Sequence, residues 1–546
     1  MSAHYQVPNN DGDAPMSIAA LEQLIAGHEP FALLDVREAG EAEKGHIAGC
    51  TFLPRRLLEF RIQELVPLWS TPIVLYDDGG DDRRAVLAWQ TLKGLGYSSV
   101  TTLADGVAGW CAAGHTLVSG SNVSSKLFGE QLLSTEHVPE LSAEELAQWL
   151  ATGGEILLCD VRTPEEHAKA HVPGARLAPS FDIGRLLGDF EKKSLPIVVH
   201  CAGRTRSIIA AQTLRDLGLD QVWALKNGTM GWTLAGYDLT HTNPAEPFQP
   251  SQDSIDLFEE RAAALAEMHH VTAIDMSEVQ AMVKARDRGK INAYFFDVRP
   301  LTNYLAGHIA GTVALPGGQA VQRADEFVAV RFAPIVFIDD LEGRAAVTAS
   351  WFQRMGYPDV RVMREGIKGW MAESRPLETG RRRRAPLGLE AAAKAGLLIS
   401  PESARLALQN TPDTIVLNVD HSRNFADAHL EGSAWVPRGS LEKEIGAVVP
   451  GTSTPVLITC RTGAQSCFAN ATLVEMGFTN TAVLDGGIVA WRRAGLPVAS
   501  SDLNPTEVED LVLPPYARGQ AGMKRYLEWE ERLTAQVGEH SKCRDP

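Results

Sequence analysis

The chain has 546 residues, of which 45% are hydrophobic and 22% charged, and its formal net charge is −17. This composition is typical of soluble globular proteins, and the length predicts roughly three to five domains. The acidic balance argues against nucleic acid and anionic membrane surfaces as partners. Seven cysteines at irregular spacings, without a Cys-x-x-Cys pair, argue against a disulfide framework and favour reduced thiols.

The N-terminal residues 1–15 are polar and contain no apolar run of the kind found in secretory signals. No later stretch reaches the length of a transmembrane helix. We therefore expect a cytoplasmic protein without a membrane partner.

A short histidine element recurs four times along the chain. It reads Gly45-His46-Ile47-Ala48-Gly49 in the first copy, and the later copies are centred on His171, His308 and His429. The intervals of about 120 to 140 residues match whole domains and exclude a solenoid of short repeats. The sequence therefore predicts a tandem array of four domains.

Three further markers keep the phase of this repeat: an Asp-Val-Arg segment, a proline-led apolar run and a late tryptophan. The first marker ends at Arg37, Arg162 and Arg299, and its fourth copy reads Asn418-Val419-Asp420. The apolar runs begin at Pro72, Pro196, Pro334 and Pro455, and the tryptophans are Trp110, Trp232, Trp370 and Trp491.

Apolar runs without alternation, separated by helical spacing, predict buried parallel strands joined by helices. Each unit is therefore expected to be an α/β domain, a parallel sheet flanked by helices. We place domain 1 at residues 14–118, domain 2 at 138–241, domain 3 at 272–378, domain 4 at 397–500 and a C-terminal helical tail at 501–546.

The connecting segments are less regular. Helical spacing predicts a helix from Ser254 to Met268, between domains 2 and 3. The run from Arg381 to Arg384 is interpreted as a solvated linker in preference to a nucleic-acid patch, because the chain as a whole is acidic. A charged helix in the tail, Gly522 to Val537, is expected to lie against domain 4.

Two of the four proline-led runs end in a cysteine and a short polar loop. The loops read Cys201-Ala202-Gly203-Arg204-Thr205-Arg206-Ser207 and Cys460-Arg461-Thr462-Gly463-Ala464-Gln465-Ser466. A cysteine at the carboxyl end of a buried strand lies where ligands bind in open α/β sheets. N–H groups of the loop and of the next helix favour a bound anion and a thiolate there.

We therefore expect Cys201 and Cys460 to be nucleophiles. The loop residues expected to bind an anionic substrate around them are Gly203, Arg204, Thr205, Arg206 and Ser207 in domain 2, and Arg461, Thr462, Gly463 and Ser466 in domain 4.

These loops resemble the active loops of the rhodanese sulfurtransferases. The loop from Cys201 to Arg206 has six residues, as in that family, and Cys460-Arg461 followed by Gly463 is similar to the loop of the thiosulfate:cyanide sulfurtransferases. The resemblance covers most of the chain and implies four tandem rhodanese-like domains.

The other two units carry acidic residues where the cysteine would stand. Asp339 aligns with Cys201 in domain 3, whereas the alignment of Asp77 and Asp78 in domain 1 stays open because that loop is longer. Carboxylates would repel an anionic substrate, so domains 1 and 3 are expected to be inactive. Two-domain members of the family join a silent N-terminal domain to a catalytic C-terminal one. The resemblance implies two such pairs in tandem, with each silent domain forming a wall of its partner's pocket.

Residues shared with the silent domains are weaker candidates for catalysis. The repeated histidines and tryptophans are therefore expected to be structural. The resemblance implies that Arg162 binds the substrate anion, although Arg37 and Arg299 show that a structural ion pair is an alternative. Domain 4 has Asp420 at this position, and Arg423 is only a loose replacement.

The remaining cysteines have less defined roles. Cys467 would fall in the first turn of the helix after Cys460, where it could trap an oxidised Cys460, although core packing is the favoured interpretation. Buried, inert thiols are expected at Cys50, Cys111 and Cys159, and Cys543 lies in the tail.

The resemblance implies sulfur transfer by double displacement through a cysteine persulfide. A small anionic donor such as thiosulfate would supply the sulfur, and cyanide or a thiol would accept it, without a metal or cofactor. A non-catalytic sulfur carrier or scaffold is one alternative. A cysteine-dependent phosphatase is another, but it would need an arginine six positions after the cysteine, where Ser207 stands.

Overall fold

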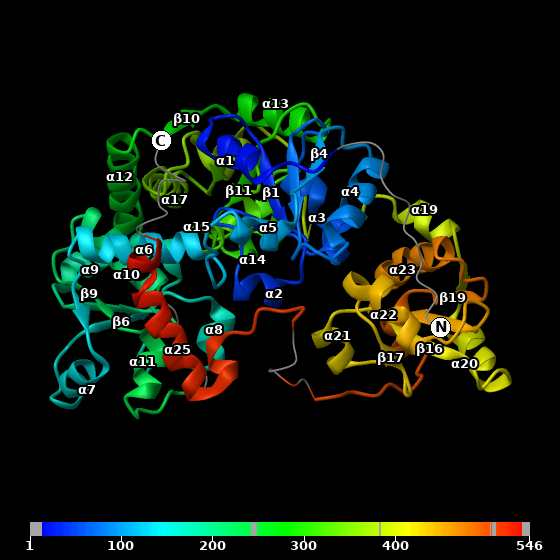
Figure 1. The fold of residues 1–546 in the computed structure, drawn as a ribbon. Helices are drawn as coiled ribbons and strands as arrows, with labels where there is room; N and C mark the ends of the chain where they lie inside the picture. Colours follow the sequence, from blue (N-terminus) through cyan, green and yellow to red (C-terminus); the bar gives the residue numbers. More distant parts are fainter. Residues whose placement is uncertain (1–13, 242–247, 382–383, 503, 505–508, 538–546) are drawn as a thin grey trace. The chain divides into compact units, whose positions relative to one another are not determined.

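The computed structural model describes residues 14–241, 248–381, 384–502, 504 and 509–537. These residues form four separate sheets, one in each expected domain, and every strand pairing within them is parallel (Figure 1). The expected α/β class with four flanked parallel sheets is confirmed. None of the described helices combines the length and apolar character needed to cross a membrane.

The sheets of domains 2, 3 and 4 share one strand order, which is β5-β9-β8-β6-β7 in domain 2. The described residues of domain 1 form the same order without the first edge strand. The strands of domains 1 and 2 are β1 (Ala32–Asp35), β2 (Thr51–Phe52), β3 (Ile73–Tyr76), β4 (Val100–Thr102), β5 (Glu140–Leu141), β6 (Leu157–Asp160), β7 (Arg176–Leu177), β8 (Ile197–His200) and β9 (Val222–Leu225). Those of domains 3 and 4 are β10 (Thr272–Ile274), β11 (Tyr294–Asp297), β12 (Val313–Ala314), β13 (Ile335–Ile338), β14 (Val360–Met363), β15 (Leu397–Ile399), β16 (Ile415–Asn418), β17 (Ala434–Trp435), β18 (Val456–Thr459) and β19 (Thr481–Leu484).

Helices cover the sheets. In domains 1 and 2 and the segment between them they are α1 (Ile18–Ala26), α2 (Ala39–Lys44), η1 (Arg55–Leu57), α3 (Leu58–Leu65), α4 (Arg84–Leu95), α5 (Gly106–Ala112), α6 (Val123–Thr135), α7 (Ala143–Ala151), α8 (Pro164–Lys169), η2 (Ser180–Leu186), α9 (Leu187–Lys193), α10 (Thr205–Asp216) and α11 (Gly228–Leu234). Domain 3 and the segment before it contain α12 (Gln252–Met268), α13 (Met276–Asp287), α14 (Leu301–Ala306), α15 (Gly317–Gln322), α16 (Ala324–Phe327), α17 (Gly343–Arg354) and α18 (Gly366–Ala372). Domain 4 and the tail contain α19 (Leu389–Lys394), α20 (Pro401–Asn410), α21 (Ser422–Asp427), η3 (Arg438–Ser440), α22 (Leu441–Val448), α23 (Ala464–Glu475), α24 (Gly487–Arg493), η4 (Pro515–Arg518), α25 (Gly519–Glu531) and α26 (Leu533–Val537).

The central strands form because short apolar runs are buried on both faces of each sheet. Every residue of β3, β8, β13 and β18 is buried, as the absence of alternation predicts. Helix starts follow ordinary capping chemistry: α8, for example, has a capping box in which Thr163 and Glu166 satisfy each other's backbone N–H groups. These local rules place the carboxyl ends of the strands, where the loops lie.

The described residues form two compact units, and their membership differs from the expected tandem pairs. One unit contains domains 1 and 4, and the other contains domains 2 and 3 together with the tail helices. The expectation that chain neighbours 1 and 2, and 3 and 4, form the pairs is therefore wrong. The reason is in the interfaces, which use residues that the repeat markers do not include.

Domains 2 and 3 are joined by α12, the connecting helix that the spacing predicts. Phe258 on α12 is fully buried, and its ring lies against Gly184 of domain 2 and Gly343 of domain 3, where a Cβ would be 2.4 Å and 2.7 Å from ring carbons. Trp351 of α17 donates a hydrogen bond from Nε1 to Thr213 of α10 at 2.9 Å. The interface is thus a packed core in which two glycines allow the close approach.

Domains 1 and 4 are held by buried ion pairs and an aromatic contact. Arg438 of domain 4 pairs with Glu59 of domain 1, with exposures of 5% and 6%. Phe60 of α3 packs edge-on against Phe468 of α23, with ring centroids 5.8 Å apart. Charges buried in this way need partners, and the carboxylate that matches Arg438 comes from the other domain.

The tail and one linker also differ from expectation. Helix α25 packs against domain 2 instead of domain 4, because its apolar residues Met523 and Leu527 cover Met230 of α11 (Figure 1). The polar segment after domain 1 contains the helix α6, which the sequence analysis did not predict. The run from Arg381 to Arg384 is only partly described, and Cys543 lies outside the described residues.

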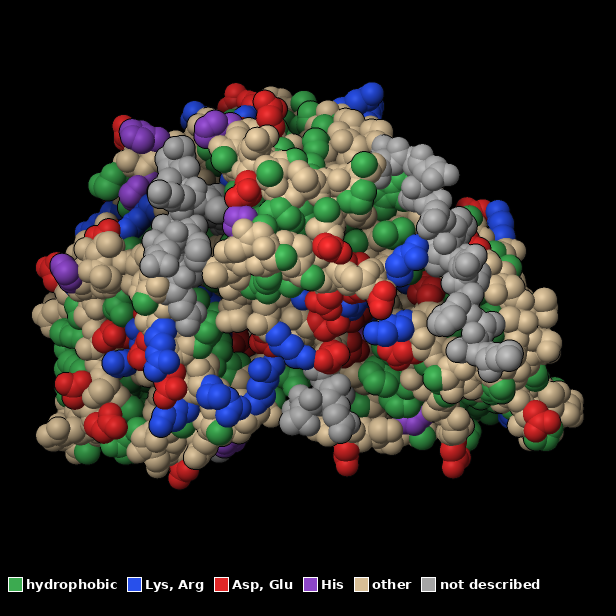
Figure 2. Space-filling view, viewed as in Figure 1, with side chains coloured by type: hydrophobic (Ala, Val, Ile, Leu, Met, Phe, Trp, Pro, Cys, Tyr) green, Lys and Arg blue, Asp and Glu red, His purple; other side chains and the backbone are tan. Residues whose placement is uncertain are grey.

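Acidic and basic side chains are interspersed on the face of the molecule drawn in Figure 2, among hydrophobic and other groups.

Candidate active sites

Each domain presents the same loop at the carboxyl end of its central strand. The first residues after β3, β8, β13 and β18 are Asp77, Cys201, Asp339 and Cys460. The parallel register of the sheets thus resolves the alignment of domain 1: Asp77 occupies the cysteine position there. Both cysteines are buried, with exposures of 2% for Cys201 and 1% for Cys460.

A glycine that the sequence analysis did not identify allows each cysteine loop to close. Gly228 and Gly487 have φ angles of 52° and 60°, and a Cβ on them would lie 2.3 Å and 2.2 Å from the carbonyl oxygens of Cys201 and Cys460. The next residue, Thr229 or Ile488, donates its backbone N–H to that same carbonyl. The available signal was a glycine four residues before each repeated tryptophan, and Gly106 and Gly366 make the same close approach in domains 1 and 3.

The Cys201 thiol lies within its own loop. Its Sγ is 3.4 Å from the Oγ of Ser207, which in turn donates to the Arg204 carbonyl at 2.8 Å. Gly203 and Thr205 are also buried. The structure therefore brings together the loop residues predicted for domain 2, around a covered sulfur.

Both arginines of this loop are paired with carboxylates. Arg204 makes two hydrogen bonds to the carboxylate of Glu130 on α6, at 2.6 Å and 2.9 Å. Arg206 makes two to Glu166 on α8, at 2.7 Å and 2.8 Å. Burial penalises a lone cation, so both guanidinium groups are neutralised by carboxylates from distant segments.

Arg162 uses only two of its three guanidinium nitrogens in hydrogen bonds to the described residues. Its Nε and Nη2 bind Asp160, and Nη2 also donates to the carbonyl oxygen of Ala170. Nη1 makes no hydrogen bond to the described residues. Arg162 thus has the structural ion pair that was one alternative, and it retains one free donor nitrogen for a ligand.

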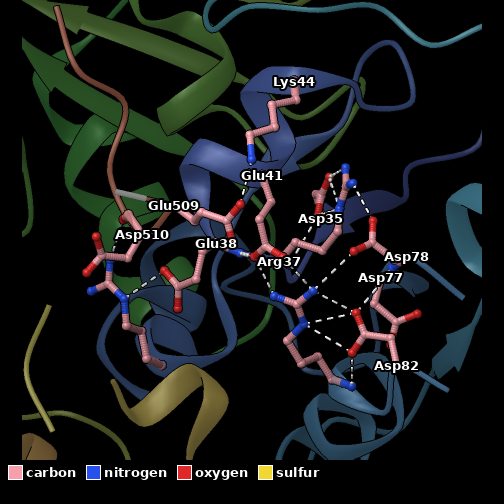
Figure 3. A network of polar contacts seen from close by, with 12 residues as sticks. Asp35, Arg37, Glu38, Glu41, Lys44, Asp77, Asp78, Asp82, Glu509 and Asp510 are labelled. Atoms are coloured by element: carbon pink, nitrogen blue, oxygen red, sulfur yellow. Dashed lines mark hydrogen bonds and ion pairs between the residues drawn. The ribbon is translucent and has the colours of Figure 1, made fainter. Parts of the chain in front are cut away.

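The silent domains occupy that same nitrogen with a carboxylate. Nη1 of Arg37 donates to Asp78 at 2.8 Å (Figure 3). Nη1 of Arg299 donates to Asp340 at 3.2 Å. Both aspartates directly follow the cysteine position, where domain 2 has Ala202. The loops of domains 1 and 3 therefore carry a carboxylate at a place where domain 2 has none.

Internal ion pairs also occupy the remainder of the silent loops. In domain 3 the carboxylate of Asp339 is held by Arg344, and Glu259 of α12 accepts the backbone N–H groups of Glu342 and Gly343. In domain 1, burial and the nearby Asp82 raise the pKa of Asp77 to about 6. Neither loop holds a sulfur nucleophile.

The Cys460 loop has a different electrostatic arrangement. Gly463 donates its backbone N–H to the Cys460 Sγ at 3.1 Å, while Asp420 accepts the backbone N–H of Arg461 at 2.7 Å. Burial raises the pKa of the Cys460 thiol, Asp420 adds to that rise, and contacts with Ser466 and Thr462 oppose it. A carboxylate thus stands where Arg162 stands in domain 2.

The other residues predicted for domain 4 are placed as follows. Ser466 is buried beside the cysteine, and Thr462 is exposed. Arg461 is half-exposed, with Nη1 3.1 Å from Asn424 Oδ1 and 3.5 Å from Asp427. Arg423 is exposed on α21, so the expectation that it is at best a loose replacement stands.

Silent domains do border the active loops, although in a different pairing from the expected one. Gln465 of domain 4 donates to the Arg56 carbonyl of domain 1 at 3.0 Å. In the other unit, a small cavity beside Thr205 and Arg206 is lined on its far side by Gly318 and Val321 of domain 3.

The repeated histidines and tryptophans are structural, as expected. In all four copies the histidine Nδ1 is within 3.0 Å of the carbonyl oxygen four residues earlier, and the indole N–H is bonded to the carbonyl six residues later. Because the contacts are the same with and without a cysteine, they serve the fold.

Among the other cysteines, Cys467 lies in the core of domain 4 with Phe468 and Leu473, which supports packing over a redox role. Cys50 and Cys159 are buried as expected, but Cys111 is exposed, because α5 presents it to solvent after the buried Trp110. The described residues contain no cluster of His, Cys, Asp and Glu suited to a metal ion.

A family profile described as the Rhodanese-like domain matches residues 17–113, 142–235, 277–373 and 400–494. The chain belongs to the rhodanese family. Four tandem rhodanese-like domains are thereby confirmed, and relatives named as sulfurtransferases support sulfur transfer as the general activity.

Relatives extend the comparison from single domains to the whole chain. A crystal structure of a thiosulfate sulfurtransferase from Pseudomonas aeruginosa is 33% identical, covers 97% of this chain and 99% of its own, and has a TM-score of 0.87. A sulfurtransferase of Allochromatium vinosum is 32% identical over 99 residues, which are 18% of this chain and 92% of the relative. A putative thiosulfate sulfurtransferase of Mycobacterium tuberculosis is 25% identical over 259 residues, which are 38% of this chain and 90% of the relative.

Proposed function

We propose that this rhodanese-family protein is a thiosulfate sulfurtransferase that works through persulfides on Cys201 and Cys460. The observation that carries the proposal is the free Nη1 of Arg162 beside the Cys201 loop. In both silent domains the corresponding nitrogen binds a carboxylate, so an anion of the donor fits the same place in domain 2.

In the first step the cysteine thiolate attacks the outer sulfur of thiosulfate. The sulfur–sulfur bond of the donor breaks, its electron pair leaves with sulfite, and a cysteine persulfide forms. In the second step an acceptor such as cyanide or a thiolate attacks the outer sulfur of the persulfide, and the cysteine leaves as a thiolate. Electrons balance within the two displacements, so neither a metal nor a redox cofactor is required.

Loop donors would stabilise the anionic sulfur. Gly463 already donates to the Cys460 Sγ, and Ser207 lies within reach of the Cys201 Sγ. Such fixed donors act on developing charge without reorganising during the reaction. Arg162 would hold the sulfite portion of the donor at Cys201, whereas domain 4 offers Arg461 and the opposing Asp420.

The test is incubation with thiosulfate labelled in its outer sulfur, followed by intact mass and peptide measurement. We expect one labelled sulfur on Cys201 and one on Cys460, each lost on addition of cyanide with formation of thiocyanate. Cys201→Ser and Cys460→Ser should each remove the label from one peptide. Loading without release to any acceptor would indicate a sulfur carrier, and absence of loading on both cysteines would refute the proposal.

A further inference from the structure

The C-terminal helix α25 covers the Cys201 loop. It packs on α11 and α6 within the same compact unit, and Figure 1 shows it beside both helices. A Cβ placed on Gly203 would lie 3.0 Å from Met230, 3.5 Å from Glu530 and 3.6 Å from Tyr526. The residues of α25 are therefore in contact distance of the active loop.

Glu530 is one of two residues of α25, with Trp529, that have a buried polar atom without a hydrogen-bond partner among the described residues, and it is the one that reaches the Cys201 loop. It is 1% exposed, and its Oε1 accepts a hydrogen bond from the hydroxyl of Thr205 at 2.7 Å. Its Oε2, the atom near Gly203, is buried and has no hydrogen-bond partner among the described residues. A buried carboxylate oxygen left in this way costs about 1 to 3 kcal/mol or more, so its persistence calls for an explanation.

The silent domain 3 provides a contrast. There Glu259, also from a helix outside the sheet, reaches the equivalent loop, but its Oε2 accepts two backbone N–H groups. The carboxylate in domain 3 is thus satisfied by the loop itself. The carboxylate at the Cys201 loop retains an open acceptor.

Lys126 and Arg204 are cations near Glu530, and their charge opposes the rise that burial causes in its pKa. Arg204 is bound by Glu130, and the Nζ of Lys126 donates to the Ser121 carbonyl at 2.6 Å while lying over the Tyr526 ring. Oε2 nevertheless accepts no hydrogen bond from the described residues.

We propose that Glu530 is a specificity-determining residue of the Cys201 site, selecting sulfur acceptors that carry an ammonium or other N–H donor beside their thiol. The inference rests on the proposed function, because it assigns the acceptor of the Cys201 persulfide. The acceptor thiolate attacks the outer sulfur, the persulfide bond breaks, Cys201 leaves as a thiolate, and the product is the acceptor persulfide. The N–H group of the acceptor binds Oε2 during this step.

The experiment uses the full chain in a Cys460→Ser background, so that only Cys201 is loaded. After loading with thiosulfate, discharge is measured with three acceptors: 2-aminoethanethiol, 3-mercaptopropionate and cyanide. Each thiol is compared with itself on two proteins, so differences in intrinsic thiol reactivity cancel. We expect Glu530→Gln to slow discharge by 2-aminoethanethiol about tenfold, consistent with the loss of one charge-assisted hydrogen bond, and to leave cyanide unchanged.

Glu531→Gln is the matched control. Glu531 is the adjacent carboxylate, 41% exposed, and is 3.3 Å from Arg204. The persulfide of the Glu531→Gln protein should be discharged by all three acceptors at the rates of the parent. Glu530→Asp keeps the charge one methylene shorter, and it should lose the amine preference by a smaller factor, which provides a second measurement if Glu530→Gln folds poorly.

Two outcomes would overturn the inference: equal discharge by 2-aminoethanethiol in Glu530→Gln and the parent, or the same loss in Glu531→Gln. Failure of the proposed function would look different. Cys201 would not be loaded with sulfur at all, whatever residue occupies position 530. That result would refute both the proposed function and the role of Glu530.

Discussion

The two cysteine loops have the same backbone and opposite electrostatic surroundings. Cys201 and Cys460 each follow a central strand and are each closed by a glycine against the cysteine carbonyl. Around Cys201 the neighbouring strand end supplies Arg162, whereas around Cys460 it supplies Asp420. The fold thus fixes the position of the sulfur, and residues outside the loop decide which charge it faces.

Cover over the loops differs as well. The tail helix α25 lies on the Cys201 loop, while α3 and η1 of silent domain 1 adjoin the domain 4 side chains Gln465 and Arg438. One loop is therefore covered by an element that the other repeats lack, and the other by a silent copy of the same fold. We expect different acceptors at the two sites.

The largest effect is expected from placing a carboxylate beside Arg162. In a Cys460→Ser background, Ala202→Asp should lower thiosulfate turnover about a hundredfold, because the new carboxylate occupies Nη1 as Asp78 and Asp340 do in the silent domains and repels the donor. Ala202→Asn, of similar size and neutral, is the control and should lose much less. Equal losses in the two variants would mean that bulk, and not charge, silences a loop.

Replacing one cysteine at a time should show that the two sites contribute unequally to thiosulfate turnover. Cys201→Ser is expected to cost several-fold more thiosulfate turnover than Cys460→Ser, because Arg162 attracts the donor anion and Asp420 repels it. Initial rates of thiocyanate formation measure this. A larger loss in Cys460→Ser would reverse the comparison and would show that loop N–H donors outweigh the nearby charges.

Alkylation compares the reactivity of the two thiols in the absence of substrate. Because burial and Asp420 raise the pKa of the Cys460 thiol, its reaction with iodoacetamide should increase steadily as the pH rises above neutrality. At mildly acidic pH we expect Cys201 to be modified several-fold faster. In Asp420→Asn, the pH at which Cys460 becomes reactive toward iodoacetamide should be lower, as measured by peptide mapping. An unchanged pH dependence would show that Asp420 does not control the reactivity of Cys460.

The smallest expected effect is on the pH dependence of folding stability, through His200, the residue directly before Cys201. Burial lowers the pKa of His200 to about 4, against about 6.5 in an unfolded chain. As the pH falls, the unfolded state therefore binds the proton before the folded state does. Above pH 6.5 His200 has no effect on the free energy of unfolding. As the pH falls from 6.5 toward 4, it lowers the free energy of unfolding progressively, by up to about 3 kcal/mol.

His200→Thr introduces the residue that domain 4 has at this position, Thr459. Its midpoint of thermal unfolding should depend less on pH between 6.5 and 4 than that of the parent. Identical pH dependence in the two proteins would show that His200 is not the titrating group.

Much of the organisation follows from sequence alone. Apolar runs without alternation, repeated with their Asp-Val-Arg, histidine and tryptophan markers, were sufficient for four parallel sheets and for the structural role of His171. The cysteine positions, and the aspartate that stands at this position in domain 3, were also readable because strand, loop and helix are contiguous in the chain.

Tertiary structure alone decided what surrounds those loops. Glu130 and Glu166, which neutralise Arg204 and Arg206, lie 74 and 40 residues away in sequence, and Glu530 lies 325 residues from Thr205. The pairing of domain 1 with domain 4 likewise depends on contacts such as Arg438 with Glu59, which no repeat marker records. Local spacing determines secondary structure and the strand-end loop, whereas buried charge is satisfied by whichever carboxylate the fold brings near, and that choice is not encoded in the neighbourhood of the loop.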